Sequence, residues 1–367
     1  MRSVHMKLWV FIGLVVLTSW APSSARGIAD SGVGPALTSI GPLAFGPDGT
    51  LFAADNQSAT IFGLDLGAQA RGAVAGAKAL DGIDQKLAAM LGTGPREITI
   101  TDLAVHPTSH NAFVAVMRGQ GTAASPAIFR IDGAGAIDLV SLQSVKFSKL
   151  ELPNAPAANP TARRNARSDS VTDMAFANGQ LWIAGLSSEE FSSKLRAVSY
   201  PFNTIDRGTS VEIFHGNHGQ VETRSPVYTF LPYMINNQAH LIAAYLCTPL
   251  VKFPVATLKP GEKVRGTTIA ELGAGNRPLD MILYKKGGRE FLLMSNNSRG
   301  VMKIPTDTFA TASAITAPVA SETAGVAYET IASMKGVEQL DQLDAQNSIV
   351  IARGDAGALN LQVVPLP

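Results

Sequence analysis

Short apolar runs separated by polar turn residues fill most of the chain. GPLAFGPDGTLFAAD at 41–55 is an apolar run, a tight P-D-G-T turn and a second apolar run. The same plan recurs in TDLAVHPTSHNAFVAV at 101–116 and TDMAFANGQLWIAG at 172–185. Runs rich in β-branched and aromatic residues, bounded by Gly, Asn, Asp and Pro, are typical of strands and tight turns. Helical periodicity is confined to 82–91, where the spacing predicts one short helix.

The strand pairs form part of a longer repeat. Three further copies of the pair lie at 227–245, 279–295 and 337–352. A third strand follows with a recurring apolar pattern, as in IFGL at 61–64, IFRI at 128–131, LVKF at 250–253 and VMKI at 301–304. A weaker fourth strand often comes next, for example AIDLVSL at 136–142 or TTIAEL at 267–272. Four antiparallel strands repeated at roughly 50–70 residues predict an all-β propeller, most simply with six four-stranded blades.

Two alternatives to six blades remain at this point. A seventh blade would need a strand set within 140–168 or 305–336, where none is complete. A β-sandwich would need the six hairpins to resemble one another by chance. The ordered repetition favours the propeller over the sandwich.

On these repeated units, residues 38–367 resemble the six-bladed propellers of the NHL, gluconolactonase/regucalcin and soluble quinoprotein group. The resemblance covers the blade pattern and includes no catalytic motif. It implies a single ring-shaped domain whose loop-rich face carries any site. In the soluble quinoproteins that face holds a quinone through arginine, asparagine and a histidine base. In gluconolactonase-like propellers a divalent metal lies near the central channel, held by Glu, Asn and Asp.

The first 25 residues have the pattern of a leader. A short basic segment, MRSVHMK, precedes an apolar run at 8–21, and Ser23-Ser24-Ala25 offers small residues for cleavage. We expect a signal peptide at 1–25, with an uncleaved membrane anchor as the alternative. The remaining 26–367 would then form one propeller domain that is periplasmic or secreted, with no membrane span after cleavage.

Composition narrows the partners. Lys and Arg number 30 against 29 Asp and Glu, so no basic excess points to nucleic acid. Hydrophobic residues make up 46% and charged residues 16%, which excludes a largely disordered chain. Cys247 is the single cysteine, so no internal disulfide can form.

Polar side chains gather in the connections that a propeller places on one face. The loop HGNHGQVETRS at 215–225 contains His215, His218, Glu222 and Arg224. Connections in blades four and five add Cys247, Asn276, Arg277, Asn296, Asn297 and Arg299, and 162–170 adds Arg163, Arg164 and Arg167. Since these blades are neighbours, we expect their loops to converge.

This grouping has three interpretations. The two histidines, Glu222 and the Cys247 thiolate suit zinc or copper. The arginines and asparagines suit a carboxylate or phosphate, which guanidinium groups bind in bidentate fashion. The third interpretation is that the polar groups close the loops through backbone hydrogen bonds.

Aspartates recur at the opening of the innermost strands. Asp102, Asp173 and Asp280 occupy equivalent places in three repeats, and Glu338 aligns with them in blade six. Converging carboxylates suit a cation such as calcium. The alternative, which repetition favours, is that each carboxylate accepts backbone N–H groups from the next blade.

The function class stays open between two hypotheses. The first is an exported binding or scaffolding propeller whose face, in blades four and five, takes a small polar or anionic ligand, a cation or a partner protein. The second is a periplasmic enzyme, either a metal-dependent lactone or ester hydrolase or a quinone-dependent dehydrogenase. Its base would be His215 or His218, oriented by Glu222. In this hypothesis Asp280 with Asn296 or Asn297 would hold calcium or another divalent metal, and a quinone is the less favoured cofactor.

Overall fold

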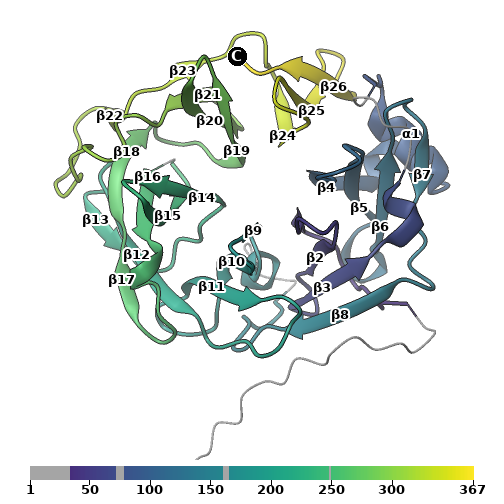
Figure 1. Cartoon of the computed structure of the whole chain (residues 1–367), viewed down its shortest axis with the longest axis horizontal. Helices are drawn as coiled ribbons and strands as arrows, with labels where there is room; N and C mark the ends of the chain where they lie inside the picture. The colour runs from purple at the N-terminus through teal and green to yellow at the C-terminus, as the bar shows by residue number, and fades with distance from the viewer. Residues whose placement is uncertain (1–33, 72–77, 160–164, 248) are drawn as a thin grey trace, which may run out of the picture.

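The computed structural model describes residues 34–71, 78–159, 165–247 and 249–367. Its strands form six sheets arranged as blades around one axis, so the all-β, six-bladed propeller is confirmed (Figure 1). The helix α1 (Ile83–Met90) forms where the periodicity predicts it. The leader predicted at 1–25 lies outside the described residues, as do Arg163 and Arg164.

The first three blades take their strands from residues 43–265. Blade one contains β1 (Leu43–Phe45), β2 (Leu51–Asp55), β3 (Thr60–Asp65) and β8 (Lys146–Glu151). Blade two contains β4 (Ile98–Val105), β5 (Ala112–Arg118), β6 (Ser125–Ile131) and β7 (Ile137–Leu139). Blade three contains β9 (Asp173–Ala177), β10 (Gln180–Leu186), β11 (Ser193–Ser199) and β12 (Thr209–His215), with β13 (Gln220–Glu222) and β17 (Lys263–Arg265) paired to β12.

The other three blades complete the ring. Blade four contains β14 (Thr229–Ile235), β15 (Gln238–Ala244), β16 (Pro249–Pro254), β18 (Thr267–Leu272) and β22 (Thr323–Gly325). Blade five contains β19 (Pro278–Lys286), β20 (Arg289–Asn296), β21 (Gly300–Pro305) and β23 (Glu329–Thr330). Blade six contains β24 (Val337–Gln342), β25 (Asn347–Arg353) and β26 (Leu359–Pro365). Five 3-10 turns, η1 (Gly67–Ala70), η2 (Pro95–Glu97), η3 (Gly121–Ala123), η4 (Ala166–Asp169) and η5 (Val255–Thr257), lie between the described strands.

The hydrophobic core is divided among the gaps between blades. Each of six clusters of buried side chains joins one blade to a neighbour; Leu103 and Val114 of blade two, for example, pack with Ile349 and Ile351 of blade six. Strand β2 is buried along its whole length, and the other second strands are buried over most of theirs, because neighbouring blades cover both of their faces. This explains why these strands appear in the sequence as nearly continuous apolar runs.

The blades do not follow the ring in the order of the sequence. Strand β4 packs between β1 and β24, whereas β1 packs between β4 and β9, so blades one and two exchange places (Figure 1). Two pairings between segments far apart in the sequence hold this arrangement together. After blade two it returns to add β8 to the outer edge of blade one. Before α1, Leu80 exchanges backbone hydrogen bonds with Leu361 at the edge of β26.

Gly185 in β10 marks a close approach between blade three and the segment that precedes it. A Cβ at this position would lie 2.1 Å from the carbonyl oxygen of Ser170. Gly185→Ala is therefore expected to lower the free energy of unfolding by about 1–2 kcal/mol, since backbone must move to admit the methyl group. Urea denaturation measures this loss. Gly94→Ala, where the added Cβ meets nothing within 4 Å, should change stability little.

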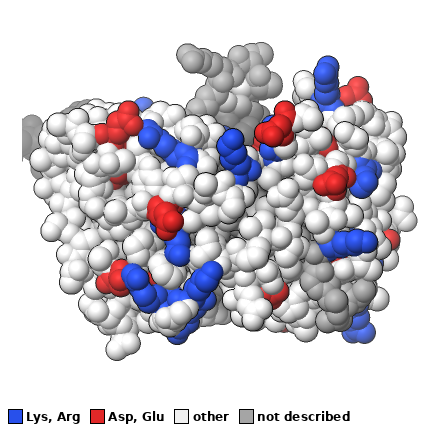
Figure 2. Space-filling model, turned by 90° about the horizontal axis from the view of Figure 1, so that it is seen from above, with Lys and Arg blue, Asp and Glu red and all other residues white. Residues whose placement is uncertain are grey.

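The outer surface carries charges of both signs. On the side of the ring shown in Figure 2, Lys and Arg lie interspersed with Asp and Glu, and no broad area has one sign. This agrees with the near balance of basic and acidic residues in the sequence. In the described residues, no helix has the length and apolar character needed to cross a bilayer.

Candidate functional site

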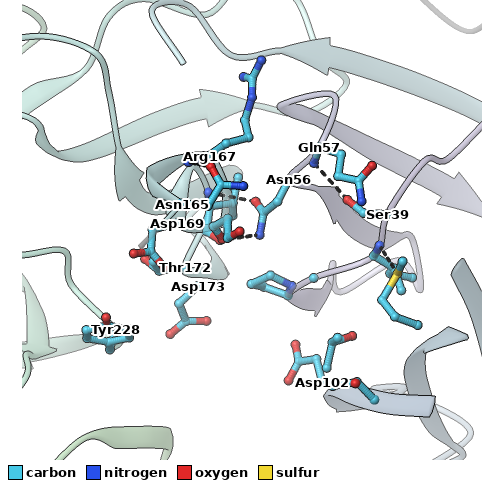
Figure 3. Close-up of a pocket in the computed structure, with 18 of the residues that line it drawn as sticks. Ser39, Asn56, Gln57, Asp102, Asn165, Arg167, Asp169, Thr172, Asp173 and Tyr228 are labelled. Carbon is cyan, nitrogen blue, oxygen red and sulfur yellow. Dashed lines mark hydrogen bonds between the residues drawn. The ribbon is translucent and has the colours of Figure 1, made fainter. Parts of the chain in front are cut away.

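A cavity of about 810 Å³ lies at the centre of the ring, among the connections between second and third strands and between blades. This central cavity has the size of small-molecule binding pockets. All six blades contribute to its lining, which includes Ser39, Pro42, Asn56, Gln57, Asp102, Met117, Asn165, Arg167, Asp169, Thr172, Asp173, Tyr228, Arg277, Asp280, Glu338 and Gln339. Figure 3 shows Asp102, Asp173, Tyr228 and Asn56 around it.

The three predicted aspartates all lie on the central cavity, where they share one pattern of hydrogen bonds. In each of them one carboxyl oxygen accepts the N–H of the following residue. The other oxygen accepts an N–H from the inner strand of a neighbouring blade, at Leu43, Phe230 and Leu340, at 2.5, 2.8 and 2.9 Å. These carboxyl groups therefore tie the blades together. This is the arrangement in which each carboxylate accepts backbone N–H groups from the next blade.

In blade six the expected acid is not the one that makes this bond. Asp341, not Glu338, accepts the N–H of the following residue and that of Val105 in blade two, the latter at 2.6 Å. Glu338 instead pairs with Arg353, at 2.6 Å. Asp341 lies three positions further along β24 than Glu338, so alignment of the strand openings by sequence selects the wrong residue.

The aspartates are half-buried and close to one another, and both conditions disfavour their ionised forms. Burial raises the pKa of Asp102 to about 8, with a further contribution from the charges of Asp173 and Asp341. Burial likewise raises the pKa of Asp173 to about 7 and that of Asp341 to about 6. Burial and then repulsion from Asp102 and Asp173 raise the pKa of Asp280 well above its ordinary value.

Arg277 lies at the mouth of the central cavity. Its guanidinium carbon is 4.4 Å from the centre of the Tyr228 ring, a cation–π contact that holds the side chain in place. Arg277 is exposed, and within the described part of the chain it has no ion-pair partner. A positioned guanidinium of this kind can bind an anionic group through paired N–H donors.

Asn56 fixes the wall that carries η4. Its amide nitrogen donates to the carbonyl oxygens of Ser168 and Val171, and its amide oxygen accepts from the Val171 N–H and the Ser170 hydroxyl. Arg167 lies on this segment, and in Figure 3 its guanidinium points away from the aspartates. The Asn56 side-chain amide, through both its nitrogen and its oxygen, thus joins blade one to the segment that precedes β9 of blade three.

The second group of predicted residues forms a separate site. His215, His218, Glu222 and Cys247, which we call the histidine cluster, lie where β12 ends in blade three and where β15 turns into β16 in blade four. Glu222 accepts from His215 Nδ1 at 3.0 Å, from His218 Nδ1 at 2.6 Å and from the Ser225 hydroxyl. Burial alone would raise the pKa of Glu222, but these hydrogen bonds lower it to about 2. None of these residues lines the central cavity.

Most of the other predicted ligand residues close loops. Asn276 and Asn296 are buried and bonded to each other at 2.9 Å. Asn297 accepts the Arg277 N–H at 2.7 Å, and Arg299 pairs with Glu322 at 2.6 Å. Arg224 is exposed and does not line the central cavity. The loops of blades four and five therefore supply Arg277 and Asp280 to the cavity, and Cys247 to the histidine cluster.

Several site residues were not singled out from the sequence. Asn56 and Gln57 stand in a polar turn after β2 that resembles any other turn. Tyr245 and Glu271 contribute buried polar atoms beside the histidine cluster, yet both lie within otherwise ordinary strand patterns. The recognisable signal was a polar residue in an apolar run, as at Glu271 in TTIAEL.

Comparison with known proteins identifies no family for this chain. No protein-family model matches the sequence, and no curated protein matches it. Among solved structures, a PQQ-bound aldose sugar dehydrogenase from Streptomyces coelicolor is 14% identical over 94% of this chain and 100% of that one, with a TM-score of 0.32. A periplasmic gluconolactonase from Pseudomonas aeruginosa is 14% identical over 90% and 87%, with a TM-score of 0.35. Extracellular domains 1–2 of Drosophila Semaphorin 1b are 9% identical over 94% and 88%, with a TM-score of 0.38.

Proposed function

We propose that the chain is a binding propeller whose central cavity takes a small polar molecule with an anionic group. The observation that carries this proposal is Arg277, which is held over Tyr228 at the mouth of the cavity with no ion-pair partner among the described residues. The anionic group, a carboxylate or phosphate, would bind the guanidinium. Hydroxyl groups of the ligand would meet the polar lining beneath it.

The charge state of the cavity supports this choice of ligand. The raised pKa values of Asp102 and Asp173, about 8 and about 7, keep these two groups partly protonated near neutral pH, which limits their repulsion of an anion. A protonated carboxyl group can also donate a hydrogen bond to a ligand oxygen. The leader pattern at 1–25 supports action outside the cytoplasm, periplasmic or secreted.

The proposal predicts a preference between matched ligands. Sugar acids and sugar phosphates should raise the melting temperature of the protein in a thermal-shift screen, and their neutral parent sugars should not. Arg277→Gln should weaken binding of an identified ligand about tenfold or more in calorimetric titration, because one charge-assisted contact contributes about 1.5–3 kcal/mol. Arg224→Gln, which changes an exposed arginine that does not line the cavity, is the control. Equal binding by the neutral sugars, or unchanged affinity in Arg277→Gln, would contradict the proposal.

A further inference from the structure

We propose that His215, His218 and Cys247 form a binding site for one zinc or copper ion, separate from the central cavity. A ring nitrogen of each histidine and the Cys247 sulfur lie within 4.8 Å of one another. Nitrogen and sulfur ligands of a tetrahedral zinc ion lie about 3.3–3.6 Å apart, given bond lengths of about 2.0–2.3 Å. Small side-chain adjustments would therefore bring all three donors onto one ion.

Glu222 orients both rings for this task. It accepts from Nδ1 of His215 and Nδ1 of His218 with the same oxygen, which leaves Nε2 of each ring turned away from the carboxylate. Metal-binding histidines ordinarily donate their second ring N–H to a carboxylate or carbonyl, which fixes the tautomer and the direction of the free nitrogen. Glu222 supplies that partner to two rings at once.

In the part of the chain that the structure describes, three buried polar atoms beside the histidine cluster have no hydrogen-bond partner, and the first of them is the free nitrogen of His215. His215 is 1% exposed, and its Nε2 makes no hydrogen bond. The nearest carboxylate oxygen, Oε2 of Glu271, is 3.7 Å away, too far for a hydrogen bond, and is itself buried without a partner. The Tyr245 hydroxyl is a third buried polar atom with no partner. Buried polar atoms are normally paired, so three such atoms beside the histidine cluster point to a ligand-binding site there.

The donor set determines the class of metal. Two imidazole nitrogens and a thiolate suit zinc and copper, whereas calcium and magnesium require oxygen ligands. Glu271 would add negative charge beside the ion. His218 has 46% of its side chain exposed and Cys247 is half-buried, so an ion can enter from solvent and one coordination position can stay open to water or a ligand.

The lone cysteine makes the site directly measurable. Cys247 is the single thiol of the chain, so every thiol signal reports on this site. Titration of the reduced, full chain with Zn²⁺, with Co²⁺ as its spectroscopic substitute, and in a separate arm with copper is expected to show one bound ion per chain. A thiolate-to-metal absorption band should appear, and bound Zn²⁺ should slow alkylation of Cys247. Copper(II) is expected to bind more tightly than zinc at such donors, so the resident ion is identified by metal analysis of protein purified from its native host.

Variants at the accessible positions test the assignment without disturbing the core. Cys247→Ser and His218→Gln are expected to weaken binding about 100-fold or more, and Cys247→Ser should also abolish the thiolate band. His110→Gln, on a turn between β4 and β5, should bind as the unaltered chain does. Failure of the reduced protein to bind either metal, or binding that persists unchanged in Cys247→Ser and His218→Gln, would overturn the proposal.

Glu222 is a positioning residue in this scheme, and its substitution gives a graded result. Glu222→Gln should weaken metal binding about 10- to 100-fold while the thiolate band remains, because all three ligands are still present. A purely structural role for Glu222 would lower the melting temperature without changing metal affinity in the folded protein.

Discussion

Asp55→Ala is expected to lower the free energy of unfolding by about 3 kcal/mol or more, measured by urea denaturation at pH 7. Asp55 has no exposed surface, and its carboxylate accepts hydrogen bonds from the N–H groups of Thr38, Gln57 and Ser58 and from the hydroxyl groups of Thr38 and Ser39. Removal of the carboxylate leaves several of these donors without an acceptor, and each buried unsatisfied donor costs about 1–3 kcal/mol.

The loss at Asp55 should depend on pH in a defined direction. The hydrogen bonds from Ser39, Thr38 and Ser58 outweigh the effect of burial and lower the pKa of Asp55. A carboxyl group with a lowered pKa stabilises the fold above the unfolded-state pKa of about 3.9 and loses that contribution as the pH falls. The difference between the two proteins should therefore shrink at acidic pH. Asp65→Ala, at an exposed aspartate of the same blade that accepts one N–H, should cost less than about 1 kcal/mol.

Asp55 also connects the fold to the central cavity. Ser39 donates to Asp55 at 2.5 Å and accepts from the Gln57 N–H at 3.0 Å, and both Ser39 and Gln57 line the cavity. A less drastic substitution, Asp55→Asn, should therefore weaken ligand binding as well as stability. If it weakened neither, the wall around Ser39 would not depend on this carboxylate.

The blade pattern was predictable because each blade repeats the same local chemistry. The hairpin expected at 172–185 is β9 and β10, and the fourth strands expected near 136–142 and 267–272 are β7 and β18. The position of each blade in the ring was not predictable from the local sequence. The pairing of β3 with β8 and the contact of β4 with β24 depend on side chains far apart in the chain, and an apolar alternation does not specify its partner.

The same contrast applies to the candidate sites: residues placed by the repeat or by one loop could be predicted together, and residues placed by contacts between distant segments could not. Asp102, Asp173 and Asp280 could be placed together because equivalent positions in a ring of repeats face a common centre. His215, His218 and Glu222 could be placed together because one short loop contains them. Glu271 and Tyr245 could not, because the burial of Glu271 Oε2 and of the Tyr245 hydroxyl depends on how blade four packs against the end of β12.

Between pH 5 and pH 8 the free energy of unfolding is expected to fall by on the order of 5–8 kcal/mol, which is the second large effect. The folded-state pKa values of Asp341, Asp173 and Asp102 are raised to about 6, 7 and 8, above the unfolded value of about 3.9. In this window the folded protein binds more protons than the unfolded chain, so stability decreases as the pH rises, by about 1.4 kcal/mol per pH unit for each retained proton. Melting temperatures across this range measure the fall.

Asp173→Asn separates this titration from other causes. The amide keeps one acceptor oxygen but loses one of the two N–H contacts, to Phe230 or Met174, so the variant should be less stable than the unaltered chain at pH 5. At pH 8 the difference should narrow by on the order of 2–3 kcal/mol, because asparagine has no charge to bury. A constant difference across the range would mean that Asp173 does not titrate there.

The same titration should control ligand binding, which connects stability with the proposed function. As Asp173 and Asp102 ionise, negative charge accumulates beside Arg277, and affinity for an anionic ligand should fall as the pH rises from 6 to 9. In Asp173→Asn the fall should be shallower, whereas binding of metal to the histidine cluster should not follow this dependence. A cavity that binds anions equally at both ends of the range would show that the aspartates tie the blades together and leave recognition to Arg277.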